Sequence, residues 1–175
     1  MSFVSTYSRR GDAQSGFSLI EVGVSLTVVA VLLALAVPSF QSLLLNAQLR
    51  TTAESLSSGL QLTRSEAVRR NAQSTLTLDG TTWTVAVGNA PVQTNPGDGS
   101  GKTQIVASQS ALTFDGVGWV TPLPATDITF DISNPSGGVC ATAGGPMRCM
   151  RIAVSAGGQI RMCDPAASAN QATAC

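Results

Sequence analysis

Residues 16–40 are GFSLIEVGVSLTVVAVLLALAVPSF, an apolar run that contains a single carboxylate, Glu21. The part from 17 to 37 is long enough to cross the roughly 30 Å hydrocarbon core of a bilayer as one helix. Arg9 and Arg10 precede it. Basic residues on the amino-terminal side predict that this end stays cytoplasmic and that the bulk of the chain lies outside. The sequence therefore predicts a single-pass membrane helix followed by an exported domain.

Glu21 is the anomaly in this helix, because an ionised carboxylate at the centre of a membrane helix costs about 2.5 to 3.5 kcal/mol, and less near its end. A secretory signal has its small-residue cleavage site after the apolar stretch, whereas Gly16 comes before it. Cleavage after Gly16 would leave a new amine on Phe17, about one helical turn from Glu21. That amine, on the same or a neighbouring subunit, is the expected partner of Glu21. The alternative is a carboxylate that is simply tolerated at the membrane interface.

The motif GFSLIEV at 16–22 resembles the type IV prepilin signature. In that family a prepilin peptidase cleaves after the glycine and methylates the new amino-terminal phenylalanine, and the glutamate guides addition of the subunit to a filament. The resemblance implies that Gly16 is the cleavage position, Phe17 the methylated residue and Glu21 the assembly residue. The family often has a proline where Pro38 stands. Pro38 should kink the helix, since it lacks an amide donor and clashes with the preceding turn.

The helical pattern continues to about residue 73 with an apolar stripe on one face. The stripe consists of Leu49, Ala53, Leu56, Leu60 and Ala67, at spacings of four, three, four and seven. Such a stripe must be buried, and a sheet is the expected cover. We therefore expect an α+β fold in which a long amino-terminal helix, half transmembrane and half amphipathic, packs on an antiparallel β-sheet.

The residues after the helix alternate in the manner of strands. Asp79-Gly80 predicts a hairpin between strands at 74–78 and 82–87. Further strands are expected at 103–108, 112–114, 118–120, 127–132, 149–154 and 159–163, the last two joined by a turn. Segments 89–102 and 134–145 are expected to be loops. Trp83 and Trp119 are expected in the core or the sheet, with a binding surface as the alternative.

The domain organisation follows from these patterns. Residues 1–16 are expected to be a leader peptide, 17–38 a transmembrane and filament-core helix, and 39–175 a periplasmic or extracellular globular domain that includes the amphipathic half of the helix.

Four cysteines lie near the carboxyl end: Cys140, Cys149, Cys163 and Cys175. They form no CxxC pair and the chain has no His, which disfavours zinc. An even number in an exported domain favours two disulfides. Three connectivities are open. Cys140–Cys149 with Cys163–Cys175 is preferred because these pairs close short local loops.

The composition argues against an enzyme and predicts no cofactor and no metal. Without His, the commonest general base and metal ligand is missing, and the only lysine is Lys102. Neither a P-loop nor a dinucleotide-binding glycine motif is present. Ten basic and ten acidic residues give a net charge of zero, so nothing general favours a nucleic-acid partner.

Three stretches resemble the FimT/GspH group of minor pilins and pseudopilins: LQLTRSEAVRRNAQSTLTL at 60–78, LTFDGVGWV at 112–120 and IAVSAGGQIRMC at 152–163. The resemblance implies a minor pilin of a type IV pilus, built in at or near the tip. It implies prepilin peptidase and other major and minor pilins as partners. The subunit would sit in the inner membrane with its carboxyl-terminal domain in the periplasm, and on the cell-surface pilus after assembly.

Two alternatives stay open. One is a pseudopilin of a type II secretion system. The other is a minor pilin that binds DNA during natural transformation, because some members with a Gly-Arg-x-Arg motif in the last hairpin do so. Here Gln159 replaces the first Arg of that motif. The candidate DNA contacts are Arg148, Arg151 and Arg161, and their alternative is a set of solvated strand arginines.

Overall fold

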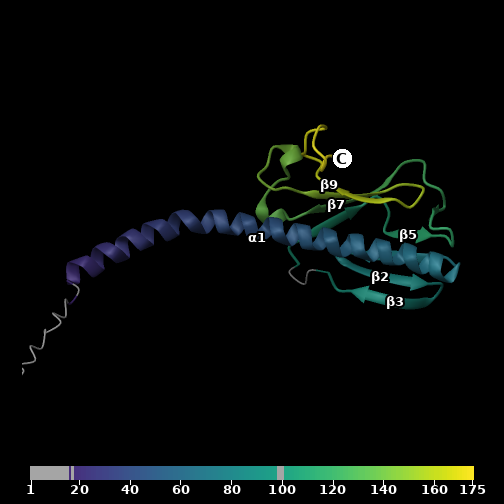
Figure 1. The fold of residues 1–175 in the computed structure, drawn as a ribbon, viewed down its shortest axis with the longest axis horizontal. Helices are drawn as coiled ribbons and strands as arrows, with labels where there is room; N and C mark the ends of the chain where they lie inside the picture. The colour runs from purple at the N-terminus through teal and green to yellow at the C-terminus, as the bar shows by residue number, and fades with distance from the viewer. Residues whose placement is uncertain (1–15, 17, 98–100) are drawn as a thin grey trace, which may run out of the picture. The chain divides into compact units, whose positions relative to one another are not determined.

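The computed structural model describes residues 16, 18–97 and 101–175. One long helix, α1 (Leu19–Arg70), is followed by strands (Figure 1). The chain divides into two compact units, Met1–Ser39 and Phe40–Cys175. We call the helical part of the first unit, 19–39, the stem and the second the globular unit. Helical backbone continues through Pro38, and the kink expected there stays a prediction.

Within the globular unit, α1 buries the stripe that its sequence predicts. Leu49, Ala53, Leu56, Leu60 and Ala67 are all fully buried, which confirms the prediction. The helix ends at Arg70, slightly earlier than expected, because Asn71 adopts a left-handed conformation with φ of 47°. The amide of Ala72 then donates to the carbonyl oxygen of Ala67 at 3.1 Å, a common way to close a helix.

The strands form two antiparallel sheets rather than the single sheet expected. The first has the order β3-β2-β1-β5-β6 and the second the order β4-β7-β8-β9. Their bounds are β1 Ser74–Asp79, β2 Thr82–Val87, β3 Ala90–Asn95, β4 Gln104–Ala107, β5 Ala111–Phe114, β6 Val120–Thr121, β7 Ile128–Ser133, β8 Met150–Val154 and β9 Ile160–Cys163. In the view of Figure 1, β2 and β3 lie on one side of α1 and β7 and β9 on the other. The prediction of one sheet was wrong because distant pairings such as β4 with β7 leave no local signal.

Strand β3 contradicts the loop predicted for 89–102. It pairs with β2 through a two-residue turn at Gly88-Asn89, where Gly88 has φ of +59°. The Gly-Asn dipeptide is itself a hairpin signal that the many turn residues further on obscured. Pro91 is compatible with β3 because the strand lies at the edge of the sheet.

Other boundaries differ in detail. Strand β6 begins at Val120 rather than at 118, because Asp115 organises the preceding turn: its Oδ1 accepts hydrogen bonds from the amides of Val117 (3.0 Å) and Trp119 (2.9 Å). The segment expected as a loop at 134–145 contains two short 3-10 helices, η1 Pro135–Gly137 and η2 Ala141–Ala143.

The helix and both sheets share one apolar core that includes Phe114, Phe130 and Trp83. The Trp83 ring lies against Gly59, where an added Cβ would come within 3.0 Å of it, and its Nε1 donates to the Ser55 hydroxyl at 3.2 Å. Trp119 does not join the core: it is 53% exposed, so the expectation of core or sheet packing was wrong for this residue. Its neighbour Val120 is buried instead, and side chains alternate along an extended chain.

Candidate functional site

The stem is the first candidate site because its apolar surface is uncovered. Residues 19–37 have a mean hydropathy of 2.5, and none of the window is buried in the globular core. By length and composition this segment is able to cross a membrane. A helix that is apolar all round needs lipid or other helices as its surroundings.

Glu21 lies in the first turn of α1 and is exposed. The hydroxyls nearby are satisfied inside the helix: Ser25 donates to the carbonyl oxygen of Glu21 and Thr27 to that of Val24, both at 2.7 Å. Within the described part of the chain, the Glu21 carboxylate forms no ion pair. Gly16 is exposed, and Phe17 and the leader at 1–15 lie outside the described residues. Among the polar side chains of the stem that the structure describes, this carboxylate is the one still in need of a partner.

The second candidate site is an open hollow on the globular unit of about 770 Å³, which we call the groove. It is lined by Gln61, Arg64, Ser65, Val68, Arg69, Val117, Gln159 and Ile160. These residues come from the end of α1, the β5–β6 loop and the β8–β9 hairpin. They belong to the three stretches whose sequences are typical of the FimT/GspH group, and the fold brings the stretches together. Sequence reasoning did not predict this convergence.

Two glycines fix the wall of the groove. Gly118 and Gly158 have φ of +91° and +76°, a conformation that glycine adopts without steric cost. They approach so closely that a Cβ on Gly158 would collide with the carbonyl oxygen of Gly118. The Arg64 Nε donates to that same oxygen at 3.1 Å, and the amide of Val120 donates to the Ala156 carbonyl at 3.0 Å. The β5–β6 loop and the β8–β9 turn are therefore locked to each other and to α1.

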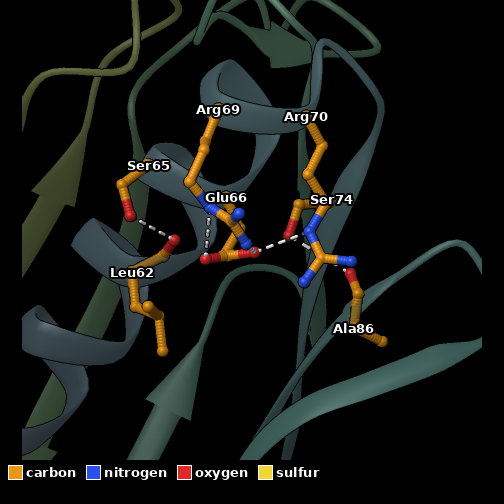
Figure 2. Close-up of polar contacts among 7 residues, drawn as sticks. All are labelled: Leu62, Ser65, Glu66, Arg69, Arg70, Ser74 and Ala86. Carbon is orange, nitrogen blue, oxygen red and sulfur yellow. Dashed lines mark hydrogen bonds and ion pairs between the residues drawn. The ribbon is translucent and has the colours of Figure 1, made fainter.

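Glu66 organises the last turns of α1, as Figure 2 shows. Its carboxylate accepts from Arg69 Nη2 at 2.6 Å and from Arg70 Nε at 2.8 Å. The hydrogen bond from Arg69, more than any other effect, lowers the pKa of Glu66, and Glu66 in turn raises the pKa of Arg69. Arg69 and Arg70 follow Glu66 by three and four residues, and this spacing would have predicted the cluster from the sequence. Basic side chains near the carboxyl end of a helix also interact favourably with the partial negative charge that the helix dipole places there.

The three candidate DNA contacts lie around the last hairpin, and each has a partner. Arg151 forms a two-point ion pair with Asp131, at 2.6 and 2.9 Å, and this interaction raises the pKa of Arg151. Arg148 lies 3.7 Å from Asp164, and Arg161 donates to the Cys175 carbonyl oxygen at 3.1 Å. Carboxylates beside Arg148 and Arg151 weaken these two as phosphate ligands, whereas Arg161 bonds to an uncharged carbonyl oxygen and keeps its charge. DNA binding at this hairpin stays a prediction.

The structure contains the two disulfides preferred from the sequence, Cys140–Cys149 and Cys163–Cys175. The first closes a short loop that contains the second 3-10 helix, η2. The second ties the tail to β9, next to a bridge between Asp164 and Ala174. Among the described residues, no cluster of three or more His, Cys, Asp or Glu side chains is arranged to hold a metal ion.

Comparison with known proteins supports the pilin-like reading of this architecture. The chain is similar to the type IV minor pilin FimU of Pseudomonas aeruginosa strain PAO1, solved in two crystal forms. In space group P21 the identity is 23% and the TM-score 0.56, covering 71% of this chain and 94% of that chain. In space group P65 the identity is 25% and the TM-score 0.54, covering 70% and 97%. Among curated protein sequences, none matches this chain significantly.

These similarities confirm the pilin-like α+β fold expected from the sequence, and pilins are structural rather than enzymatic proteins. The family model described as "Type II transport protein GspH" matches residues 52–158. Because that match spans more than half of the sequence, the chain belongs to the GspH family of pilins and pseudopilins.

Proposed function

We propose that this protein is a minor pilin of a type IV pilus. Prepilin peptidase cleaves it between Gly16 and Phe17 and methylates Phe17, and the mature subunit then joins the filament, at or near its tip. Before assembly it is anchored in the inner membrane with the globular unit in the periplasm, and afterwards it is part of the surface pilus. Its function is to assemble with other pilins, not to catalyse a reaction.

One observation carries the proposal: an uncovered apolar stem whose single carboxylate, Glu21, lies in the first helical turn. Lateral packing of such stems in a filament replaces lipid with other apolar helices. The Phe17 amine of an adjoining subunit then neutralises Glu21, which an apolar surrounding would otherwise penalise. The structural similarity to FimU over 70% of this chain supports the type IV branch.

The test replaces Glu21 with Ala in the full-length chain and measures its amount in purified pili. We expect incorporation to fall at least tenfold, because the subunit loses the charge that recognises its neighbour. Ser25→Ala is the matched control, since it removes a stem hydroxyl that bonds only within the helix. Normal incorporation of the Glu21→Ala variant would refute the mechanism.

Mass spectrometry of the chain recovered from pili tests the processing step. We expect a mature chain that begins at methylated Phe17. A chain that begins downstream of the stem would contradict both the cleavage position and the role of Glu21.

The second candidate function is a pseudopilin of a type II secretion system, and the description of the matching family favours it. The stem mechanism is the same in both machines. Deleting the gene separates them: loss of twitching with normal enzyme secretion supports the pilus, and the reverse supports the secretion system.

A further inference from the structure

We propose that the groove binds a segment of an adjacent pilin-like subunit that presents a carboxylate beside apolar side chains. This inference rests on the proposed filament function and specifies which surface of the globular unit meets a neighbour.

The groove is prearranged for binding. The contacts of Gly118 with Gly158 and Arg64 hold three distant parts of the chain in register. Asp115 fixes the β5–β6 turn by accepting the amides of Val117 and Trp119. A partner therefore does not have to order these loops, which lowers the entropic cost of association.

The charge of the groove selects an acidic partner. Arg64 and Arg69 line it, and no acidic side chain is among its lining residues. Two acids lie nearby, and both are engaged: Glu66 is shared between Arg69 and Arg70, and Asp115 accepts the amides of Val117 and Trp119. Arg64 uses its Nε on Gly118, and in the described part of the chain its terminal nitrogens have no hydrogen bond. A guanidinium with free donors matches a carboxylate in two-point geometry.

Apolar side chains beside these cations select a protein partner. Val117 is 73% exposed, and Val68 and Trp119 are about half exposed. Val68 and Val117 line the groove, and Trp119 follows Gly118 in the chain without being a lining residue. Trp and Arg are both enriched among the residues that dominate protein interfaces. DNA phosphates would bind the arginines but would gain little from contact with the valines. A protein segment with a carboxylate flanked by apolar side chains contacts both the arginines and the valines favourably.

The first experiment places a photoreactive benzoylphenylalanine at Val117 in the full-length chain in cells that assemble the filament. We expect a cross-link that mass spectrometry identifies as a different pilin-like subunit. The same probe at Val139, exposed in a different part of the globular unit, is the control for random collision. A Val117 adduct only with nucleic acid, only with a second copy of this chain, or no adduct at all would overturn the proposal.

The second experiment tests the charge at the same position. Val117→Glu should lower incorporation into pili about fivefold or more, because it repels the partner carboxylate and competes for Arg64. Val117→Lys changes size and polarity similarly and should lower incorporation clearly less. Val139→Glu should leave it unchanged. Equal effects of Glu and Lys at 117 would refute an acidic partner.

The outcomes keep the two proposals distinct. If Glu21→Ala abolishes incorporation and Val117→Glu leaves it normal, the filament function stands and the groove proposal fails. If Glu21→Ala is incorporated normally, the filament mechanism itself fails, whatever happens at Val117.

Discussion

Helix α1 serves two different purposes in the stem and in the globular unit. In the stem its apolar side chains are exposed, and Glu21 has no ion pair within the described residues. In the globular unit the same helix buries a complete stripe, and no buried side-chain nitrogen or oxygen of the described residues lacks a hydrogen bond.

The difference teaches where each part finds its stabilising contacts. The globular unit satisfies its core within the chain. In the described part of the stem, the internal polar contacts are those of the backbone and of two hydroxyls, so its free energy depends on lipid or on other subunits. Substitutions in the two regions should therefore affect different measurements.

The largest difference between the stem and the globular unit is expected from a matched pair of side-chain truncations to alanine, one in each region. Phe130→Ala should lower the free energy of unfolding by about 3 to 5 kcal/mol, because it empties a fully packed site. Leu33→Ala in the stem should leave that free energy unchanged, because Leu33 is exposed. Urea unfolding of the full chain in detergent, followed by near-ultraviolet circular dichroism, measures both. A comparable loss in Leu33→Ala would show that the two regions are energetically coupled.

Removing the carboxyl-terminal disulfide tests how much the globular unit depends on its own internal cross-links for stability. Cys163→Ser with Cys175→Ser should cost about 3 kcal/mol, since the unfolded chain regains the freedom of a closed loop. Thermal unfolding of the full chain in detergent measures the loss. Ser168→Ala, an exposed change in the same tail, is the control and should have no effect. An unchanged melting temperature in the double variant would mean that the tail contributes little to the fold.

The smallest expected effect is a pH dependence. Because Arg69 and Arg70 hold the pKa of Glu66 below its ordinary value of 4.5, the folded state binds this proton less readily than the unfolded state. The resulting stabilisation is complete above about pH 4.5 and disappears as the pH falls through the lower, folded-state value. Glu66→Gln should therefore flatten the decline of stability on acidification. Stability curves of both proteins between pH 3 and 7 measure it, and identical slopes would contradict the role of Glu66.

Much of the fold was predictable because its signals are local. The stripe from Leu49 to Ala67 has helical spacing, and Asp79-Gly80 marked the β1–β2 hairpin correctly. The β3 strand was missed because its residues are exposed and do not alternate. Trp119 was misplaced because the strand expected at 118–120 begins only at Val120, and Trp119 ends the turn that Asp115 organises, with its side chain exposed.

The candidate sites divide in the same way. Gly16, Phe17 and Glu21 form a contiguous motif, so the sequence alone identified them as candidates, and the structure adds only the surroundings of Glu21. The groove joins Arg64, Val117 and Gln159, which are far apart in the chain. Their proximity depends on how the two sheets close over α1.

The sequence by itself determined the stem, the lone acid within it and the amphipathic helix, since each depends on neighbouring residues or on helical periodicity. Only the tertiary structure decided that the strands form two sheets, that two of the three candidate arginines, Arg148 and Arg151, face carboxylates, and that a cationic groove with apolar edges exists. These features depend on contacts between distant residues, and such contacts are fixed by packing of the whole core rather than by any local pattern.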